Sequence, residues 1–90
     1  MYIVYAIESL SKRRIYFGQT KDLSRRLKLH NAGKVRSTKT DRPWEVVVAE
    51  TFRTRSEAMW TERRIKKSHD FQAKWLKNRV VNNRFVAKKE

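Results

Sequence analysis

Two apolar runs separated by a polar stretch open the chain, as in two strands joined by a turn. Residues 2–8 (YIVYAIE) are rich in β-branched and aromatic side chains, which favours a buried strand. Residues 9–13 are polar and typical of a turn, and residues 15–17 (IYF) form a second short apolar run before Gly18. The pattern therefore predicts an antiparallel hairpin.

A helical period begins after this hairpin. One face carries residues at three- and four-residue spacing, namely Leu23, Leu27 and His30. Thr20 or Asp22 can cap the start of this helix, and Gly33 is suited to its end. Residues 34–43 are polar and basic, which predicts an exposed loop. Residues 44–52 (WEVVVAETF) have strand character again.

The clearest helical pattern in the chain covers residues 54–68. Thr54 and Glu57 form a capping-box pattern at its start. The buried side of this helix can be supplied by Ala58, Met59, Trp60 and Ile65. Residues 70–82 predict a third helix, and the side chains expected to turn inward are Phe71, Trp75 and Leu76.

These elements follow one another in the order β-β-α-β-α-α. The order predicts an α+β fold in which a small three-stranded antiparallel sheet is flanked by helices. Ninety residues leave no room for a second hydrophobic core. We therefore expect a single domain over residues 1–83, followed by a frayed basic tail over residues 84–90.

The charge of the chain points to a class of partner. Twenty-three Lys and Arg residues stand against nine Asp and Glu residues, for a formal net charge of +14. Such an excess resists compaction, so we expect a polyanion, a nucleic acid, to neutralise it. On charge alone, a basic surface of the ribosomal type is the alternative.

Other features exclude several classes of protein. No stretch combines a long apolar face with a basic one, and no apolar run approaches the roughly 20 residues of a bilayer span, so no membrane partner is expected. The absence of cysteine excludes disulfides and thiolate metal sites. The opening MYIVYAIESL has no basic segment before its apolar stretch and does not resemble a signal peptide. We expect a cytoplasmic protein without a small-molecule cofactor.

Five polar residues form the set best suited to chemistry: Tyr5, Tyr16, Arg26, His30 and Glu62. Pairing of the first two strands brings Tyr5 near Tyr16. A four-residue spacing places Arg26 and His30 on the same side of one helix. Glu62 stands mid-helix among several basic residues.

Hydrolysis of a phosphodiester makes demands that this set can meet. The reaction needs a group that activates water and a charge that stabilises the phosphate, and a metal often does part of both. A guanidinium presents planar paired donors to the phosphate. A lone carboxylate suits Mg²⁺, which keeps most of its waters and takes one or two protein oxygens. A phenol is a poor base unless a metal or neighbouring cations lower its pKa.

Each of the five residues also has a purely structural interpretation. A strand tyrosine can pack in the core, and Arg26 can be a solvated helix residue. His30 can end its helix, where the dipole favours a cation. Glu62 can be an ion-pair partner of Arg63 or Lys66. These residues alone therefore predict only a basic α+β domain that binds nucleic acid.

Three segments together resemble the GIY-YIG nuclease superfamily. Residues 16–34 (YFGQTKDLSRRLKLHNAGK) are similar to its central motif, in which an aromatic strand end and Gly lead through Thr and Asp-Leu into a helix with Arg-Arg-Leu and His-Asn. Residues 2–7 (YIVYAI) stand where its first tyrosine strand belongs. Residues 42–67 (RPWEVVVAETFRTRSEAMWTERRIKK) resemble its Pro-Trp strand, its Thr-Arg-Ser-Glu-Ala helix start and the Glu that follows. The resemblance covers residues 2–78 and is closest to the short, free-standing, single-domain bacterial members.

The resemblance implies a metal-dependent endonuclease and a role for each of the five residues. Tyr16 would be the general base or would position the water, and Tyr5 beside it would shape the site and share a proton. Arg26, ten residues after Tyr16 as the family spacing asks, would bind the scissile phosphate. His30 would assist proton transfer or orient Tyr16. Glu62 would hold the single divalent ion, Mg²⁺ or Mn²⁺.

The match to the family pattern has two departures. The Gly of the first signature triplet is absent, since Ile3 and Val4 precede Tyr5, a substitution that many short members share. Phe17 replaces Ile in the second triplet. Every catalytic-type position is filled, and Asn78 would match a polar residue that some members place on the last helix.

Further cations are expected to contact phosphates without reading sequence: Lys34, Arg36, Lys39, Arg42, Arg63 and Lys66. DNA is favoured over RNA as the partner. Trp44, Trp60 and Trp75 could stack on bases. Each of them adjoins apolar positions of an expected element, however, which favours packing in the core.

The sequence leaves three functions open. The first is a nuclease, which predicts metal-dependent cleavage that is lost on substitution of Tyr16, Arg26 or Glu62 while the fold persists. The second is a non-catalytic basic nucleic-acid-binding module on the same fold, which predicts salt-sensitive binding without cleavage. The third is a basic structural protein of a ribonucleoprotein, in which Tyr16 and Glu62 matter only through stability.

Overall fold

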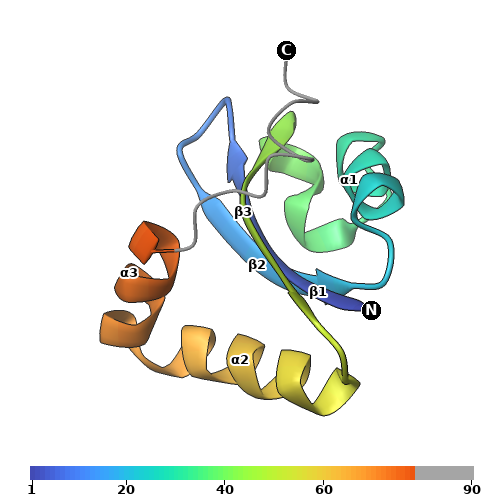
Figure 1. Cartoon of the computed structure of the whole chain (residues 1–90). Helices are drawn as coiled ribbons and strands as arrows, with labels where there is room; N and C mark the ends of the chain where they lie inside the picture. The colour runs from blue at the N-terminus through green and yellow to red at the C-terminus, as the bar shows by residue number, and fades with distance from the viewer. Residues whose placement is uncertain (79–90) are drawn as a thin grey trace.

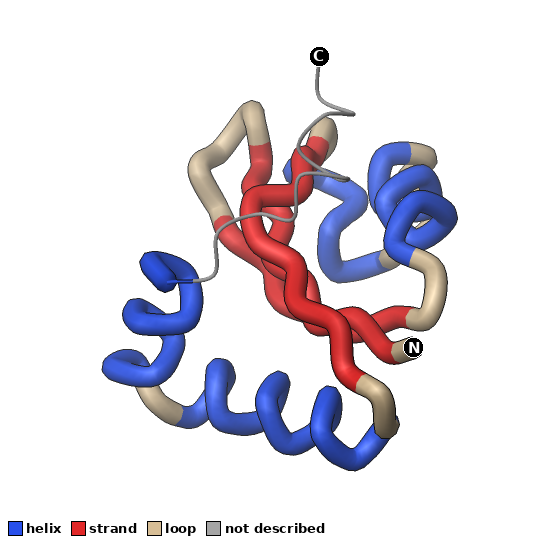
Figure 2. The backbone as a smooth tube through the Cα atoms, viewed as in Figure 1, coloured by secondary structure: helices blue, strands red, loops and turns tan. Residues whose placement is uncertain are grey.

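The computed structural model describes residues 1–78 of the chain (Figure 1; Figure 2). The elements are β1 (Tyr2–Ser9), β2 (Ile15–Thr20), α1 (Leu23–Asn31), the 3₁₀ helix η1 (Arg36–Asp41), β3 (Trp44–Phe52), α2 (Arg55–Lys67) and α3 (His69–Asn78). They confirm the predicted α+β fold and its element order. Residues 79–82 of the predicted last helix and the predicted tail over residues 84–90 lie outside the described residues. Within residues 1–78, no helix has the length and apolar character that crossing a bilayer requires.

β1 is the central strand of the sheet. The strand order is β2-β1-β3, and both neighbours run antiparallel to β1. Successive β1 side chains point to opposite faces. Tyr5 and Ile7 enter one core, and Val4 and Ala6 enter the other. Burial on both faces explains why this strand is a nearly continuous apolar run in the sequence.

Helices cover the two faces of the sheet separately (Figure 1; Figure 2). On the face that α1 covers, the buried core consists of Ile3, Tyr5, Ile7, Leu23, Trp44, Val46 and Ala49. On the face that α2 and α3 cover, it consists of Val4, Ala6, Val48, Ala58, Ile65 and Trp75. Because the sheet separates α1 from α2, a site that uses side chains from both helices has to lie at an edge of the sheet.

Local sequence explains where two of the helices begin. Asp22 is the N-cap of α1, and its side chain accepts a hydrogen bond from a backbone amide of the first turn. Thr54 and Glu57 form the predicted capping box of α2. Gly33 follows α1 with a φ of 77°, a left-handed conformation that favours glycine. The expected helix stop at Gly33 is therefore confirmed.

The predicted buried side of α2 is wrong at two positions. Met59 is 39% exposed and Trp60 is 58% exposed. The face toward the sheet is made instead by Ala58, Thr61 and Ile65, whose spacing of three and four residues keeps them on one side of the helix. The expectation that the tryptophans are packed in the core holds for Trp44 and Trp75 and fails for Trp60.

The segment predicted as an exposed loop contains the helix η1, and two of its residues are buried. Thr38 is completely buried and Asp41 is 6% exposed. The predicted exposure holds for its cations, Lys34, Arg36, Lys39 and Arg42. The polar pattern of residues 34–43 therefore conceals inward-facing residues that hold the segment in place.

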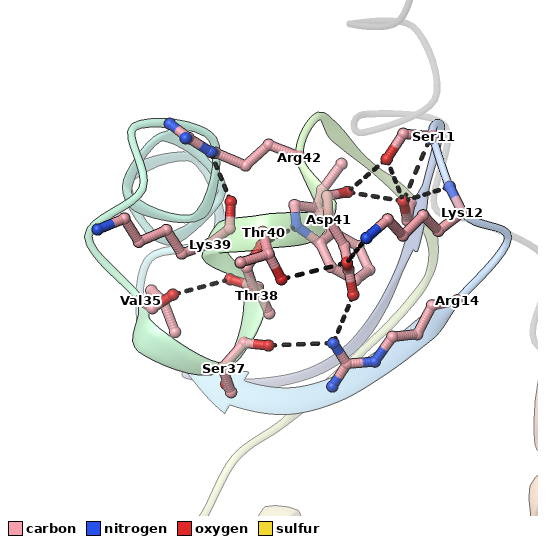
Figure 3. Close-up of polar contacts among 12 residues, drawn as sticks. Ser11, Lys12, Arg14, Val35, Ser37, Thr38, Lys39, Thr40, Asp41 and Arg42 are labelled. Atoms are coloured by element: carbon pink, nitrogen blue, oxygen red, sulfur yellow. Dashed lines mark hydrogen bonds and ion pairs between the residues drawn. The ribbon is translucent and has the colours of Figure 1, made fainter.

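Asp41 fastens η1 to the turn between β1 and β2 (Figure 3). Its carboxylate accepts a hydrogen bond of 2.6 Å from Arg14 Nη1 and lies 3.5 Å from Lys12 Nζ. Its backbone oxygen accepts a hydrogen bond of 2.6 Å from the Ser9 hydroxyl. The hydrogen bond from Arg14 lowers the pKa of Asp41 below its usual value. These contacts join segments that are distant in the sequence and fix the position of η1.

η1 in turn places Thr38 against His30 of α1. His30 is completely buried, and its Nδ1 lies 2.8 Å from Thr38 Oγ1. Burial, with a further contribution from the nearby Arg26 cation, lowers the pKa of His30 to about 4. The folded protein therefore holds a neutral imidazole at neutral pH.

The lowered pKa of His30 predicts a loss of stability in mild acid. As pH falls below about 6.5, the unfolded chain binds a proton at His30, whereas the folded protein accepts that proton only near pH 4. The contribution of neutral His30 to the free energy of unfolding is therefore full above about pH 6.5 and is lost as the pH falls to about 4. We expect the free energy of unfolding of the wild type to fall by about 3 kcal/mol more than that of His30→Gln over this window.

Urea unfolding of both proteins at pH 7, 5.5 and 4 measures this difference. Asp41 does not interfere, because a carboxylate with a lowered pKa loses its contribution only at more acidic pH. Parallel pH profiles for the wild type and His30→Gln would show that the imidazole takes up its proton equally in both states.

Candidate active site

The candidate site lies at the β2 edge of the sheet, where Gly18 permits a close approach. Tyr5 of β1 pairs with Gly18 of β2. A Cβ at Gly18 would lie 2.7 Å from Tyr5 Oη and 2.9 Å from Tyr5 Cζ, which is closer than packed side chains tolerate. The missing side chain therefore allows the Tyr5 ring to lie across the edge strand.

Tyr5 and His30 are joined by a buried hydrogen bond. Tyr5 Oη lies 2.9 Å from His30 Nε2. On the other side of the ring, the Thr38 hydroxyl donates to the backbone oxygen of Val35 at 3.3 Å, which leaves Thr38 Oγ1 to accept from His30 Nδ1. We infer that Nδ1 carries the proton and that the Tyr5 hydroxyl donates to Nε2.

The electrostatics of Tyr5 agree with its role as a donor. Burial raises the pKa of Tyr5 to about 12, although the Arg26 guanidinium beside it acts in the opposite direction. The charges of Tyr16 and Glu62 also raise it. Tyr5 thus stays protonated around neutral pH. The three groups that influence its pKa, Arg26, Tyr16 and Glu62, all lie in its vicinity.

Tyr16 lies on the same face of β2 as Gly18 and is half-buried. Its ring meets the edge of the His30 ring at 5.3 Å and that of Trp44 at 6.5 Å between centroids. Within residues 1–78, its hydroxyl makes no hydrogen bond. The structure therefore bonds His30 to Tyr5, and Tyr16 keeps a phenol that is not engaged by the described side chains.

Arg26 projects from α1 into the same region. Its side chain is half-buried, and Arg26 Nε is a buried donor without a hydrogen-bond partner in the described part of the chain. A buried donor without a partner costs free energy, on the order of 1–3 kcal/mol. Arg25, the adjacent arginine, is exposed. Arg26 is therefore the one of the two whose guanidinium has a buried donor that an anion could bind.

Glu62 reaches the β2 edge from the opposite face of the sheet. Its Oε1 accepts a hydrogen bond of 2.9 Å from Gln19 Nε2, and its Oε2 lies 2.9 Å from Lys66 Nζ. The Glu62 side chain is 18% exposed. Gln19 follows Gly18 along β2 and points to the other face, so β2 lies between Glu62 and the Tyr5 ring.

The donor set at this edge fits a weakly ligated Mg²⁺ or Mn²⁺. Nowhere in residues 1–78 do three His, Cys, Asp or Glu side chains gather as they do in protein zinc sites. A single carboxylate matches the habit of Mg²⁺, which keeps several waters and takes further oxygens from substrate phosphates. Glu62 is the residue that would hold the ion.

Three shallow hollows adjoin one another along the end of β2. The first is lined by Thr20, Lys21, Asp22, Arg25, Arg26 and Leu29. The second is lined by Tyr2, Gln19, Thr20, Lys21 and Arg55. The third is lined by Gln19, Met59, Glu62, Arg63, Lys66 and Lys67. Because Gln19, Thr20 and Lys21 are shared, the hollows form a continuous basic surface, which we call the β2-edge groove.

The groove includes only part of the predicted nucleic-acid contacts. Arg63 and Lys66 line it. The remaining four cations, Lys34, Arg36, Lys39 and Arg42, lie in or beside η1, which the Asp41 contacts hold at the opposite end of β2. Asn78 is the last residue of α3, and its side chain lies outside what the structure describes.

Sequence reasoning missed several residues of this region. The folding of the chain brings three of them to the site, namely Gln19, Lys21 and Arg55. Thr38 belongs to it through its hydrogen bond to His30. Gln19 had a possible signal, because period-two alternation after Gly18 places it on the face opposite Tyr16. Thr38 had none, since its partner is eight residues away across an irregular segment.

Comparison with known proteins identifies a family. Residues 1–77 match the GIY-YIG catalytic domain. UPF0213 protein YazA of Bacillus subtilis is 49% identical over 53 residues, UPF0213 protein RBAM_000440 of Bacillus velezensis is 47% identical, and UPF0213 protein lwe0147 of Listeria welshimeri is 49% identical over the same length. These matches cover 58% of this chain and 54%, 54% and 59% of the three relatives. The chain thus spans about half the length of the curated relatives that it matches.

The names of these relatives state no activity, so the assignment rests on the match over residues 1–77 and on the fold. The three-stranded antiparallel sheet with its flanking helices agrees with that match. The chain belongs to the GIY-YIG family, as a GIY-YIG catalytic domain.

Proposed function

We propose that this domain is a metal-dependent endonuclease that hydrolyses phosphodiester bonds in nucleic acid, with DNA preferred to RNA. The observation that carries the proposal is the convergence at the β2 edge of three groups with different chemistry. They are the phenol of Tyr16 and the Nε of Arg26, which have no hydrogen-bond partner within residues 1–78, and the carboxylate of Glu62. The family of the chain and its net charge of +14 support the same function.

Tyr16 is the proposed general base. Its hydroxyl is not engaged by other described side chains, so it can accept a hydrogen bond from a water molecule and take the proton as that water attacks phosphorus. A phenol acts as a base only where positive charge stabilises the phenolate. Arg26 and Tyr16 both influence the charge of Tyr5, so the guanidinium and the phenol share one neighbourhood, in which the bound metal and Arg26 would supply that charge.

Arg26 is the proposed phosphate ligand. Its guanidinium stays charged and presents paired donors, which suits the oxygens of the scissile phosphate as negative charge builds on them. A phosphate would also satisfy the buried Nε that the described protein leaves without a partner. The free energy that this unmatched donor costs the free protein would thus be recovered when substrate binds.

Tyr5 and His30 are proposed to position these groups. Tyr5 stays protonated and His30 stays neutral, because burial disfavours both charged forms. The hydrogen bond between them fixes the Tyr5 ring across β2, and the His30 ring supports Tyr16 from one side. They therefore orient Tyr16 and form a buried surface behind it that excludes water.

Glu62 is proposed to bind one divalent ion, Mg²⁺ or Mn²⁺. When bound, such an ion neutralises charge on the leaving oxygen and on the phosphate. Gln19 holds the carboxylate in its present orientation through Oε1. The cations of the β2-edge groove would bind flanking phosphates without reading sequence, and those around η1 would extend that contact.

The two neighbouring arginines of α1 give a matched test. Under single-turnover conditions with saturating protein, we expect Arg26→Gln to slow cleavage by about 100- to 1,000-fold, because it removes a transition-state contact. Arg25→Gln removes the same charge from an exposed position, so it should weaken binding and flatten its salt dependence while the cleavage rate stays within about threefold. Thermal unfolding of both variants controls for folding. Equal rate losses would contradict the assignment of Arg26.

The nuclease itself is tested with a panel of labelled substrates: duplex, single-stranded and branched DNA, and RNA, each with Mg²⁺, Mn²⁺ or EDTA. We expect cleavage that requires the metal and falls by about 100- to 10,000-fold in Tyr16→Phe, with a comparable loss in Glu62→Gln. Both substitutions nearly preserve shape. Salt-sensitive binding without cleavage under every metal would overturn the enzyme and favour a non-catalytic binding module.

A further inference from the structure

Both oxygens of the Glu62 carboxylate are occupied by side chains of this chain. Gln19 Nε2 donates to Oε1 at 2.9 Å, and the Lys66 ammonium donates to Oε2 at 2.9 Å. Lys66 follows Glu62 by four residues, so it lies one turn further along the same face of α2. The position that a cation would take beside Oε2 is therefore held by a lysine.

The two partners of Glu62 differ in what a metal would do to them. The amide of Gln19 is neutral and bonds to the other oxygen, so it can stay in place and keep the carboxylate turned. The Lys66 ammonium, in contrast, is a cation beside Oε2, where the metal would also bind. A divalent ion binds oxygen at about 2.1 Å, and its charge repels an ammonium only a few ångström away. The Lys66 ammonium therefore has to leave Oε2 when the ion binds.

The exposure of the two side chains makes this exchange feasible. Glu62 is 18% exposed and set against the sheet, whereas Lys66 is 53% exposed and carries its charge on a flexible stem. Lys66 can therefore swing into solvent or onto a phosphate while Glu62 remains. Arg63 and Lys67 line the same hollow, but neither has a hydrogen bond or ion pair with Glu62 within the described part of the chain.

We propose that Lys66 is the resident counter-ion of Glu62 in the free protein and competes with the divalent metal for Oε2. The inference rests on the proposed role of Glu62 as the metal ligand. The sequence marks Lys66 as a phosphate contact and as a possible ion-pair partner of Glu62. Lys66 thereby gains a further role, because its ammonium lowers the affinity of the unoccupied protein for the ion. Removing the ammonium should then tighten metal binding.

Binding of Mn²⁺ alone to the purified protein tests this, with free Mn²⁺ followed by electron paramagnetic resonance. Four proteins are compared: the wild type, Lys66→Gln, Lys67→Gln and Glu62→Gln. We expect Lys66→Gln to bind Mn²⁺ about fivefold to tenfold more tightly than the wild type. Lys67→Gln removes the same charge from the neighbouring position and should change the affinity less than about twofold. Glu62→Gln should abolish the site.

The outcomes separate this inference from the proposed function. Binding that depends on Glu62 but is equally tight in the wild type and Lys66→Gln would overturn the competition while keeping the metal site. Equal tightening in Lys66→Gln and Lys67→Gln would also overturn it, because a general charge effect would then suffice. Binding that is indifferent to Glu62→Gln in every background would remove the metal site itself. Lys66 is exposed, and the melting temperature of each variant checks that the fold is intact.

Discussion

The hydrogen bond between the Tyr5 hydroxyl and His30 Nε2 ties the central strand to α1, and the candidate site depends on where it holds them. Both groups are buried, so each would cost about 1–3 kcal/mol if left unpaired. His30 continues the chain of bonds to Thr38, and η1 is therefore fixed by the same contact. Arg26 lies one turn before His30 on α1, so the bond also sets its distance from Tyr5.

That bond exists because β2 leaves room for it. The Tyr5 ring lies so close to Gly18 that a methyl group there would meet the phenol oxygen at 2.7 Å. A larger residue would push Tyr5 away from His30 or bend the edge strand. Glycine is required here by a close approach and not by an unusual φ, which distinguishes Gly18 from Gly33 with its φ of 77°. Gly18 thus lets the Tyr5 ring lie against β2 on the face of that strand that also carries Tyr16.

The parts that sequence could predict are those determined by neighbours along the chain. Asp22 and the pair Thr54 and Glu57 cap helices through bonds within one turn, so their positions follow from local pattern. The hairpin likewise forms from adjacent segments and places Tyr5 and Tyr16 on neighbouring strands. The fold class follows from the order of such elements.

The parts that it could not predict depend on distant partners. Asp41 looks like one polar residue in a basic loop, yet it is buried because Arg14, 27 positions earlier, meets it. Gln19 meets Glu62 across 43 residues. The exposure of Trp60 escapes prediction because periodicity shows which residues share a face but not how much of the helix circumference the sheet covers. Each of these facts is a property of the packed chain and not of any segment.

A lone carboxylate in so basic a domain has consequences for how the proposed site would work. Within residues 1–78, Glu62 is the only acidic residue that lines its hollow of the β2-edge groove, and Arg63, Lys66 and Lys67 line the same hollow. These charges repel a divalent ion just as they attract a polyanion. The phosphate of a bound nucleic acid reverses that balance, because it neutralises the cations and offers oxygens to the ion. On the proposed function, substrate and metal therefore favour each other's binding, and the surplus of positive charge weakens metal binding while substrate is absent.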